Sequence, residues 1–164
     1  MTAFDTETLT AVRHYLQQIG HLIDKVAATA EGDRLWQVRL APDMLDTGCN
    51  LAVASGFAAR ALCRPAGIAW PDIPDTFTCD SLRAHHAEIR SLVAPIEIAD
   101  LRGPVKHIAG EADLEQDLAD YILRFALPNM IFHLSMAYAG LRHSGLDIGK
   151  ADFDGLHIYT PKPR

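Results

Sequence analysis

The amino-acid sequence predicts an all-α fold, an up-and-down four-helix bundle that forms one domain over residues 1–164. Two observations support this prediction. Apolar side chains recur at the spacing of an amphipathic helix in four separate segments, and proline or glycine separates the segments. The composition is that of a globular protein, because 49% of the residues are hydrophobic and 22% are charged.

The first two helices are expected near residues 6–31 and 42–64. The first follows a capping residue and ends at Gly32, a residue type that commonly terminates helices. Its apolar stripe consists of Leu9, Val12, Leu16, Ile19, Leu22, Ile23 and Val26. The second begins at Pro42, because proline is favoured in the first turn of a helix. It is rich in Ala, Gly and Ser, so a neighbouring helix can approach it closely.

The other two helices are expected near residues 78–94 and 128–143. The region between them is compatible with a short strand or hairpin before the last helix, around residues 104–108. Residues 118–127 predict a further short helix that Pro128 breaks or kinks. Proline has this effect because it lacks a backbone donor and clashes with the preceding turn.

Charge and composition exclude several partners. The net charge is −6, and the 15 Lys and Arg residues form no block, so nucleic acid is not an expected partner. No apolar segment suits a membrane span, and the acidic start MTAFDTETL is not a secretory leader. The 3 cysteines form no CxxC pair, which indicates reduced thiols in a cytoplasmic protein. Cys79 lies near a helix start, a position that can lower the pKa of a thiol.

Short motifs in the chain resemble a bacterial family of unknown function within the DinB/YfiT-like superfamily of four-helix bundles. The motifs are RLAPDM (39–44), FALPN (125–129), FH (132–133), AY (137–138), LRHSG (141–145) and IGKADF (148–153). The resemblance covers most of the chain and is most specific in RLAPDM and towards the C-terminus. It implies the DinB/YfiT-like fold. Together with the small residues of the second helix and the high apolar content, it also implies a homodimer.

The resemblance also implies divalent-metal chemistry, from which this chain departs. Better-understood superfamily members include metal-dependent thiol transferases and a thiol-dependent isomerase. They bind a metal through one histidine on the second helix and an HxxxH pair on the fourth. This chain has Asn129 and His133 at the spacing of that pair. Its second helix contains no histidine, and Cys49 and Asn50 are the nearest candidates. If zinc or nickel binds, His133 is the first ligand we expect, since Asn is a poor ligand for either ion.

Two functions from different classes remain open. In the first, the protein is a noncatalytic or small-ligand-binding module. Its pocket between helices would be lined by Asn129, His133, Asn50 and Tyr138. In the second, it is a divalent-metal-dependent enzyme related to thiol transferases. A buried His133 that only holds a hydrogen-bond partner is the structural alternative to both.

Other polar residues are expected to be structural. His85 and His86 are adjacent on one helix and project about 100° apart, so at most one is expected to face the interior. Solvated histidines are the expectation there. Lys150 and Asp152 follow a glycine turn and are expected to form a solvated, locally paired tail.

Overall fold

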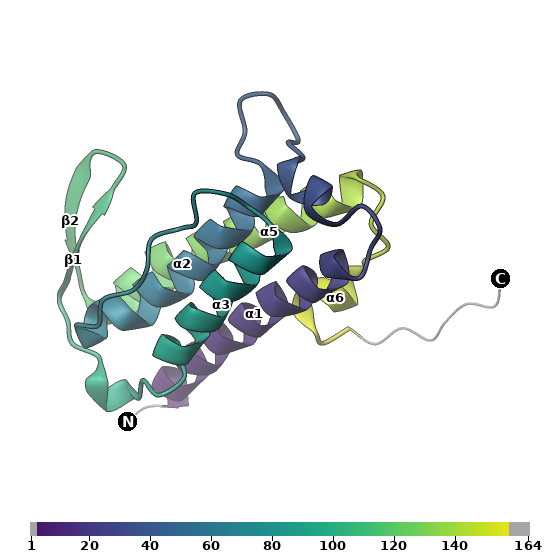
Figure 1. Ribbon diagram of the computed structural model, residues 1–164. Coiled ribbons are helices and arrows are strands. Elements are labelled where there is room, and N and C mark those ends of the chain that lie inside the picture. The colour runs from purple at the N-terminus through teal and green to yellow at the C-terminus, as the bar shows by residue number, and fades with distance from the viewer. Residues whose placement is uncertain (1–2, 158–164) are drawn as a thin grey trace.

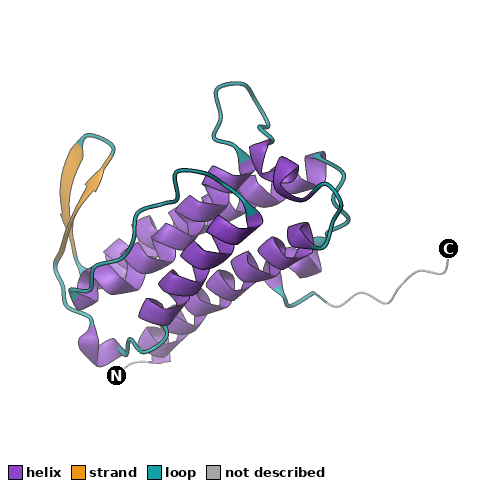
Figure 2. Ribbon diagram, viewed as in Figure 1, coloured by secondary structure: helices purple, strands orange, loops and turns teal. Residues whose placement is uncertain are grey.

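Four long helices packed side by side form the body of the molecule in the computed structural model, which describes residues 3–157 (Figure 1). These helices are α1 (Ala3–Ala27), α2 (Thr47–Ala66), α3 (Cys79–Val93) and α5 (Leu127–His143). Shorter helical segments join or flank them: η1 (Gly32–Gln37), η2 (Ile98–Asp100), α4 (Leu118–Asp120), η3 (Tyr121–Ala126) and α6 (Lys150–Asp154). The protein is mostly helical, as predicted (Figure 2). The predicted number of four helices is too small, because the short helical segments add to the four long ones. Within residues 3–157, no helix has the length and apolar character that crossing a membrane requires.

The predicted ends of the long helices need correction mainly at α1 and α2. α1 ends at Ala27, earlier than expected. α2 begins at Thr47 and not at Pro42, because Asp46 caps the helix there. The Asp46 carboxylate accepts a hydrogen bond from the backbone N–H of Cys49 at 2.8 Å. α3 and α5 lie within one residue of the predicted bounds.

α2 is the central helix, because it packs against α1, α3 and α5. Five of its alanines are at most 1% exposed: Ala52, Ala54, Ala58, Ala59 and Ala61. Such small side chains let the neighbouring helices approach closely, as the sequence predicts. At the N-terminal end of α2, Thr47 faces Gly140 of α5. A Cβ at Gly140 would collide with the Thr47 hydroxyl.

Pro128 does not break the last long helix, so the first of the two predicted effects, a break or a kink, is wrong. Residues 118–143 form one continuous helical segment, and the turn before the proline, η3, is a π-helix. The backbone N–H of Leu127 therefore donates to the carbonyl of Ile122, five residues earlier. The wider turn absorbs the irregularity that a proline introduces into an α-helix. The Asn129 side chain also donates to the Phe125 carbonyl at 2.7 Å.

A two-stranded hairpin precedes the last long helix. β1 (Val105–Ala109) pairs antiparallel with β2 (Ala112–Gln116), and Val105 lies opposite Gln116. Gly110 supplies the positive φ, 61°, that the tight turn needs. The hairpin extends away from the helices beside the C-terminal half of α2 (Figure 1).

The segment α6 packs against α1, so the expectation of a locally paired tail was wrong. Asp152 accepts a hydrogen bond from Nε2 of His21 at 2.8 Å and forms an ion pair with Lys25 at 3.1 Å. These contacts, together with a hydrogen bond from the backbone N–H of Gly149, lower the pKa of Asp152 to about 2 even though burial opposes the shift. The charge therefore ties the end of the described chain to the first helix.

Candidate functional site

A hydrogen bond between Asn50 and His133 joins α2 to α5. Nδ1 of His133 lies 2.9 Å from Oδ1 of Asn50. Asn50 stands in the first turn of α2 and is buried, whereas His133 stands in the second turn of α5 and is half-buried. The structure thus brings together two of the side chains that the sequence assigns to one pocket.

Two backbone carbonyls fix the orientation of the Asn50 amide and, through it, the proton on His133. Nδ2 of Asn50 donates to the carbonyls of Leu45 at 3.1 Å and Asp46 at 3.0 Å. Oδ1 therefore faces His133, and because a carbonyl oxygen can only accept, Nδ1 of His133 donates. A neutral imidazole carries one N–H, so Nε2 retains its lone pair and acts as an acceptor.

The surroundings favour this neutral imidazole. Burial lowers the pKa of His133, because a low-dielectric environment disfavours the charged form. The ring stacks on Phe57 with centroids 5.8 Å apart and planes 14° apart. Phe132 meets it edge-on at 5.1 Å and is itself 55% exposed. Nε2 has no hydrogen-bond partner among residues 3–157 and is not sealed from solvent.

The other two predicted pocket residues make different contacts. Asn129 is half-buried, and its amide bonds to the carbonyl of Phe125 in its own helical segment. Tyr138 packs against Phe153 of α6, with ring centroids 5.6 Å apart and planes 70° apart. Tyr138 is five residues beyond His133, which places it on another face of α5. The contacts of His133 are therefore with Asn50, Phe57 and Phe132.

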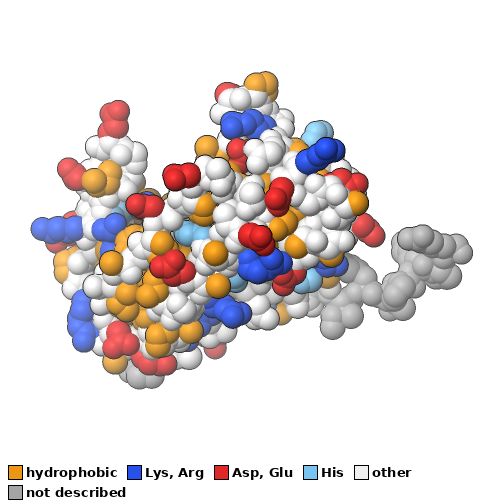
Figure 3. Space-filling model, viewed as in Figure 1, with side chains coloured by type: hydrophobic (Ala, Val, Ile, Leu, Met, Phe, Trp, Pro, Cys, Tyr) orange, Lys and Arg blue, Asp and Glu red, His pale blue; other side chains and the backbone are white. Residues whose placement is uncertain are grey.

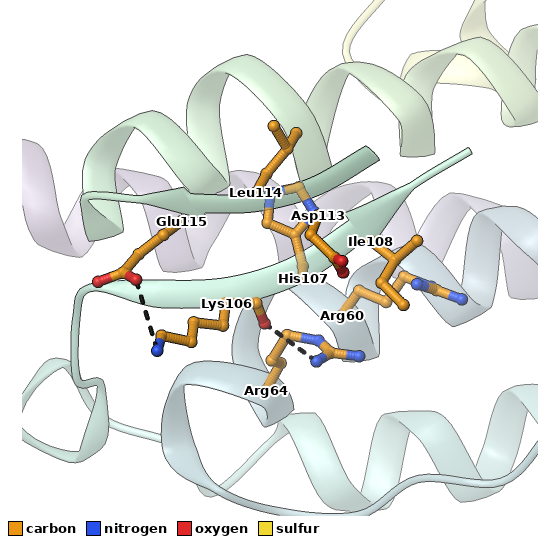
Figure 4. Close-up of a pocket in the computed structure, with 8 residues that line it drawn as sticks. All are labelled: Arg60, Arg64, Lys106, His107, Ile108, Asp113, Leu114 and Glu115. Carbon is orange, nitrogen blue, oxygen red and sulfur yellow. Dashed lines mark hydrogen bonds and ion pairs between the residues drawn. The ribbon is translucent and has the colours of Figure 1, made fainter. Parts of the chain in front are cut away.

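A groove between the hairpin and α2 is a second candidate site, which the sequence analysis missed. Its volume is about 760 Å³, and its charged and polar walls are Arg60, Arg64, Lys106, His107, Asp113 and Glu115. Figure 3 shows basic and acidic side chains together at the hairpin end of the molecule. Figure 4 shows that the two arginines rise from α2 towards the strands. Arg60 and Arg64 stand one helical turn apart, and this spacing was the available signal.

A row of aromatic rings links the two candidate sites. Phe57, which stacks on His133, meets Phe125 at 5.8 Å. Phe125 in turn lies 4.2 Å from the ring of His107 on β1. Tyr121 closes the row, 4.9 Å from His107. The row therefore runs along the boundary between α2 and the segment that contains η3 and α5.

Both His85 and His86 are buried, at 6% and 7% exposed, so the expectation of solvated histidines was wrong. The reason is that α3 lies between α1 and α2, and side chains 100° apart can each face a different neighbour. The His86 ring fills the space beside Gly20 of α1, with Nε2 only 2.7 Å from where a Cβ would stand. Burial first, then Arg90 and His85, lowers the pKa of His86 to about 4.

The pKa of the Cys79 thiol is raised, which contradicts the expected effect of a helix start. Burial is the largest cause, and the nearby Asp33 carboxylate adds to it. Sγ of Cys79 accepts a hydrogen bond from Nε1 of Trp36 at 3.3 Å, which opposes the shift but does not reverse it. The thiol of Cys63 is fully buried, and burial raises its pKa to about 11. Neither thiol has the character of a nucleophile.

Comparison with known proteins places the chain in a family. A family model described as "Domain of unknown function (DUF1993)" matches residues 5–154. The chain belongs to this family. The crystal structure of a DinB family member protein from Shewanella denitrificans is similar to it, with a TM-score of 0.78 and 24% sequence identity. The match covers 94% of this chain and 93% of that one, and at this identity it shows the fold alone. No curated protein matches the sequence.

The DUF1993 chain does not offer the donor set of a divalent-metal site at His133. Both ends of the Asn50 amide are hydrogen-bonded, and an Asn129 amide oxygen is a poor ligand for zinc or nickel, so Nε2 of His133 is the one good metal donor of these three side chains. Cys49 is half-buried, and burial followed by Asp46 raises the pKa of its thiol. Across residues 3–157, no three His, Cys, Asp or Glu side chains gather closely enough to hold an ion. Zinc sites use three or four such ligands, so the residues present do not fit the superfamily's metal.

Proposed function

We propose that this DUF1993 protein is a noncatalytic module that binds a small molecule at His133. The observation that carries the proposal is the fixed tautomer of that imidazole. Oδ1 of Asn50 accepts the hydrogen bond from the Nδ1–H group, and Nε2 is left as an unpaired acceptor. Because His133 is half-buried and this nitrogen is not closed to solvent, it is available to a ligand.

The neighbouring side chains suggest the ligand's chemistry. Phe132 is 55% exposed beside His133 and offers apolar contact area to a ligand. A molecule that suits this place has an O–H or N–H donor for Nε2 and an aromatic or apolar body. The π-helix about two turns before His133 adds support, because π-helical turns are frequent at functional sites.

Phenol is a suitable first probe, because it joins a hydroxyl donor to an aromatic ring. We expect phenol to shift the ¹⁵N resonance of Nε2 of His133 saturably in a nuclear magnetic resonance titration. The shift should vanish in His133→Ala and persist in His143→Ala, the matched control, since His143 is exposed on the same helix. An unshifted His133 resonance, or an equal response in both variants, would contradict the proposal.

A divalent-metal-dependent enzyme related to thiol transferases is the alternative, and the lone imidazole donor argues against it. Elemental analysis of protein purified without a histidine tag distinguishes the two. We expect no stoichiometric zinc or nickel. A full equivalent of either metal that disappears in His133→Ala would overturn the proposal and favour the enzyme.

We further propose that α1, α2, α3 and α5 form an up-and-down four-helix bundle that assembles as a cytoplasmic homodimer. Free Cys49, Cys63 and Cys79 support the location. The dimer rests mainly on the superfamily resemblance, because most of the small residues of α2 are already buried within the chain. Sedimentation at micromolar concentration tests it, and a monomer of 18.0 kDa would contradict it.

A further inference from the structure

The groove beside the hairpin is lined by three cationic side chains and two carboxylates, on a protein whose net charge is −6. Arg60 and Arg64 stand on its α2 wall. Lys106 stands on the opposite wall, where it forms an exposed ion pair with Glu115 at 3.6 Å. Arg60 and Arg64 have no such carboxylate partner in the part of the chain that the structure describes.

The ion pairs found among residues 3–157 include neither Arg60 nor Arg64. Each guanidinium instead lies over an aromatic ring. Arg60 stands 5.4 Å from the centre of Phe57, and Arg64 stands 5.3 Å from the centre of Trp70. Such contacts hold the planar guanidinium in place while its N–H groups stay available.

The polar partners of Arg64 are neutral. Its Nη1 donates to the Lys106 carbonyl at 3.2 Å, which ties the groove's two walls together, as the dashed line in Figure 4 shows. Its Nε is buried without a hydrogen-bond partner. Because Nε is closed to solvent, the N–H groups that Arg64 can offer to a ligand are those of its two terminal nitrogens.

His107 is a second buried group in the groove wall with an unused nitrogen. It is 5% exposed, and Nε2 lies 2.7 Å from Oε1 of Gln116. Because the Gln116 oxygen can only accept, Nε2 donates and Nδ1 of the neutral ring is an acceptor, which has no partner among residues 3–157. His107 therefore contributes a neutral ring to the groove wall and no donor for an anion, while Ile108 and Leu114 add apolar surface.

We propose that this groove binds a small organic oxyanion, a molecule with one carboxylate or phosphate group and an apolar or aromatic body. Arg60 and Arg64 bind the anionic group, because guanidinium N–H groups match the geometry of both oxyanions. Asp113 and Glu115 on the facing hairpin disfavour polyanions such as nucleic acid. A volume of about 760 Å³ suits a molecule of metabolite size. This proposal is independent of ligand binding at His133.

Benzoate and phenyl phosphate test the two oxyanions on the same aromatic ring, and neutral benzamide is the matched probe without charge. We expect at least one of the anions to bind to the full-length protein in isothermal titration calorimetry, and benzamide to bind at least about tenfold more weakly. The better anion identifies the preferred group. Failure of both anions to bind, or equal binding of benzamide, would overturn the proposal.

Variants then separate the site from general charge. Arg60→Gln and Arg64→Gln should each weaken anion binding about tenfold or more. Arg124→Gln removes the same charge from an exposed arginine that pairs with Asp120 at 3.1 Å, and it should leave binding unchanged. Equal losses in all three variants would contradict a defined site.

Asp113→Asn provides a second variant that does not depend on the arginines. It removes a carboxylate from the groove wall and should strengthen anion binding several-fold. Weaker or unchanged binding would contradict the proposed position of the anion. His133→Ala should retain anion binding, so failure of the His133 proposal and failure of this one are distinguishable.

Discussion

The interface of α2 with α5 and that of α1 with α3 each contain a histidine, but the two imidazoles are bound differently. Between α2 and α5, His133 donates to Asn50 and leaves its other nitrogen open. Between α1 and α3, His86 is buried with Nδ1 unpartnered. The larger pKa shift belongs to His86, because burial, followed by the nearby charges of Arg90 and His85, disfavours its protonated form. A perturbed pKa by itself therefore does not identify a ligand site, and the site proposed at His133 rests instead on its open Nε2.

The interface of His86 should be the more sensitive to acid. Its folded-state pKa, about 4, lies below the usual 6.5, so the unfolded chain binds the proton more tightly. Protonation therefore opposes folding progressively as pH falls from about 6.5 to about 4 and adds nothing further below that. The cost reaches on the order of 3 kcal/mol, because each tenfold difference in proton affinity is worth about 1.4 kcal/mol.

Chemical denaturation of the native protein and of His86→Leu between pH 7 and pH 4 measures this cost. The variant should lose clearly less stability over that range, because the side chain that titrates is gone. The other charged groups near His86, which are Arg90, His85 and Asp24, remain in both proteins. Parallel pH profiles would show that the unpartnered imidazole is not the source of the acid sensitivity.

The α2 and α5 interface should depend on the Asn50 amide. Asn50→Leu leaves the Leu45 carbonyl and Nδ1 of His133 without their partner, while the Asp46 carbonyl keeps its hydrogen bond from the backbone N–H at position 50. We expect it to lower the free energy of unfolding by about 2–3 kcal/mol. Urea denaturation at pH 7 measures the change.

Asn129→Leu is the matched control, because it makes the same substitution in a half-buried asparagine with one hydrogen bond. Its cost should be about 1 kcal/mol or less. His133→Ala should fall between the two variants, at roughly 1–3 kcal/mol, because it leaves Oδ1 of Asn50 unpaired. A loss of stability in Asn129→Leu as large as in Asn50→Leu would show that the hydrogen bonds of Asn50 contribute no more to stability than that of Asn129.

The smallest effect on stability is expected at Asp152, whose carboxylate pairs with His21 and Lys25 near the surface. Asp152→Asn removes the charge that His21 and Lys25 share, but both partners are about two-fifths exposed, so solvent screens the interaction. We expect a loss of about 1 kcal/mol or less at pH 7. Because the folded pKa of Asp152 is about 2, its contribution should hold above pH 4 and disappear as pH falls towards 2. Thermal melts of both proteins from pH 7 to pH 2 should therefore converge at the acid end.

The features that could be predicted from sequence are local ones. Thr78 caps α3 through the backbone N–H of Ser81 at 3.1 Å, and the helix begins where the sequence indicates. Asn50 and His133 each lie on a predictable helical face, and the structure brings these two faces together. A ligand bound to them stays a prediction.

The features that could not be predicted depend on neighbours distant in the sequence. His85 and His86 are both buried because α3 has a helix on two sides, which periodicity on one helix does not reveal. Asp152 pairs with α1, more than a hundred residues earlier in the chain. The groove requires Arg64 to reach the Lys106 carbonyl, a contact across 42 positions of sequence. Local propensity contains no information about such approaches.

The π-helical turn of η3 changes the directions in which the side chains before and after it point. A π turn amounts to one extra residue in an α-helix, and one residue corresponds to about 100° of rotation. The extra residue lets Phe125 face His107 of the hairpin while His133, further along, faces Asn50 of α2. Deleting one residue from 121–126 would regularise the helix but turn one of these faces away from its neighbour. The irregular turn thus allows one helical segment to contact both the hairpin and α2.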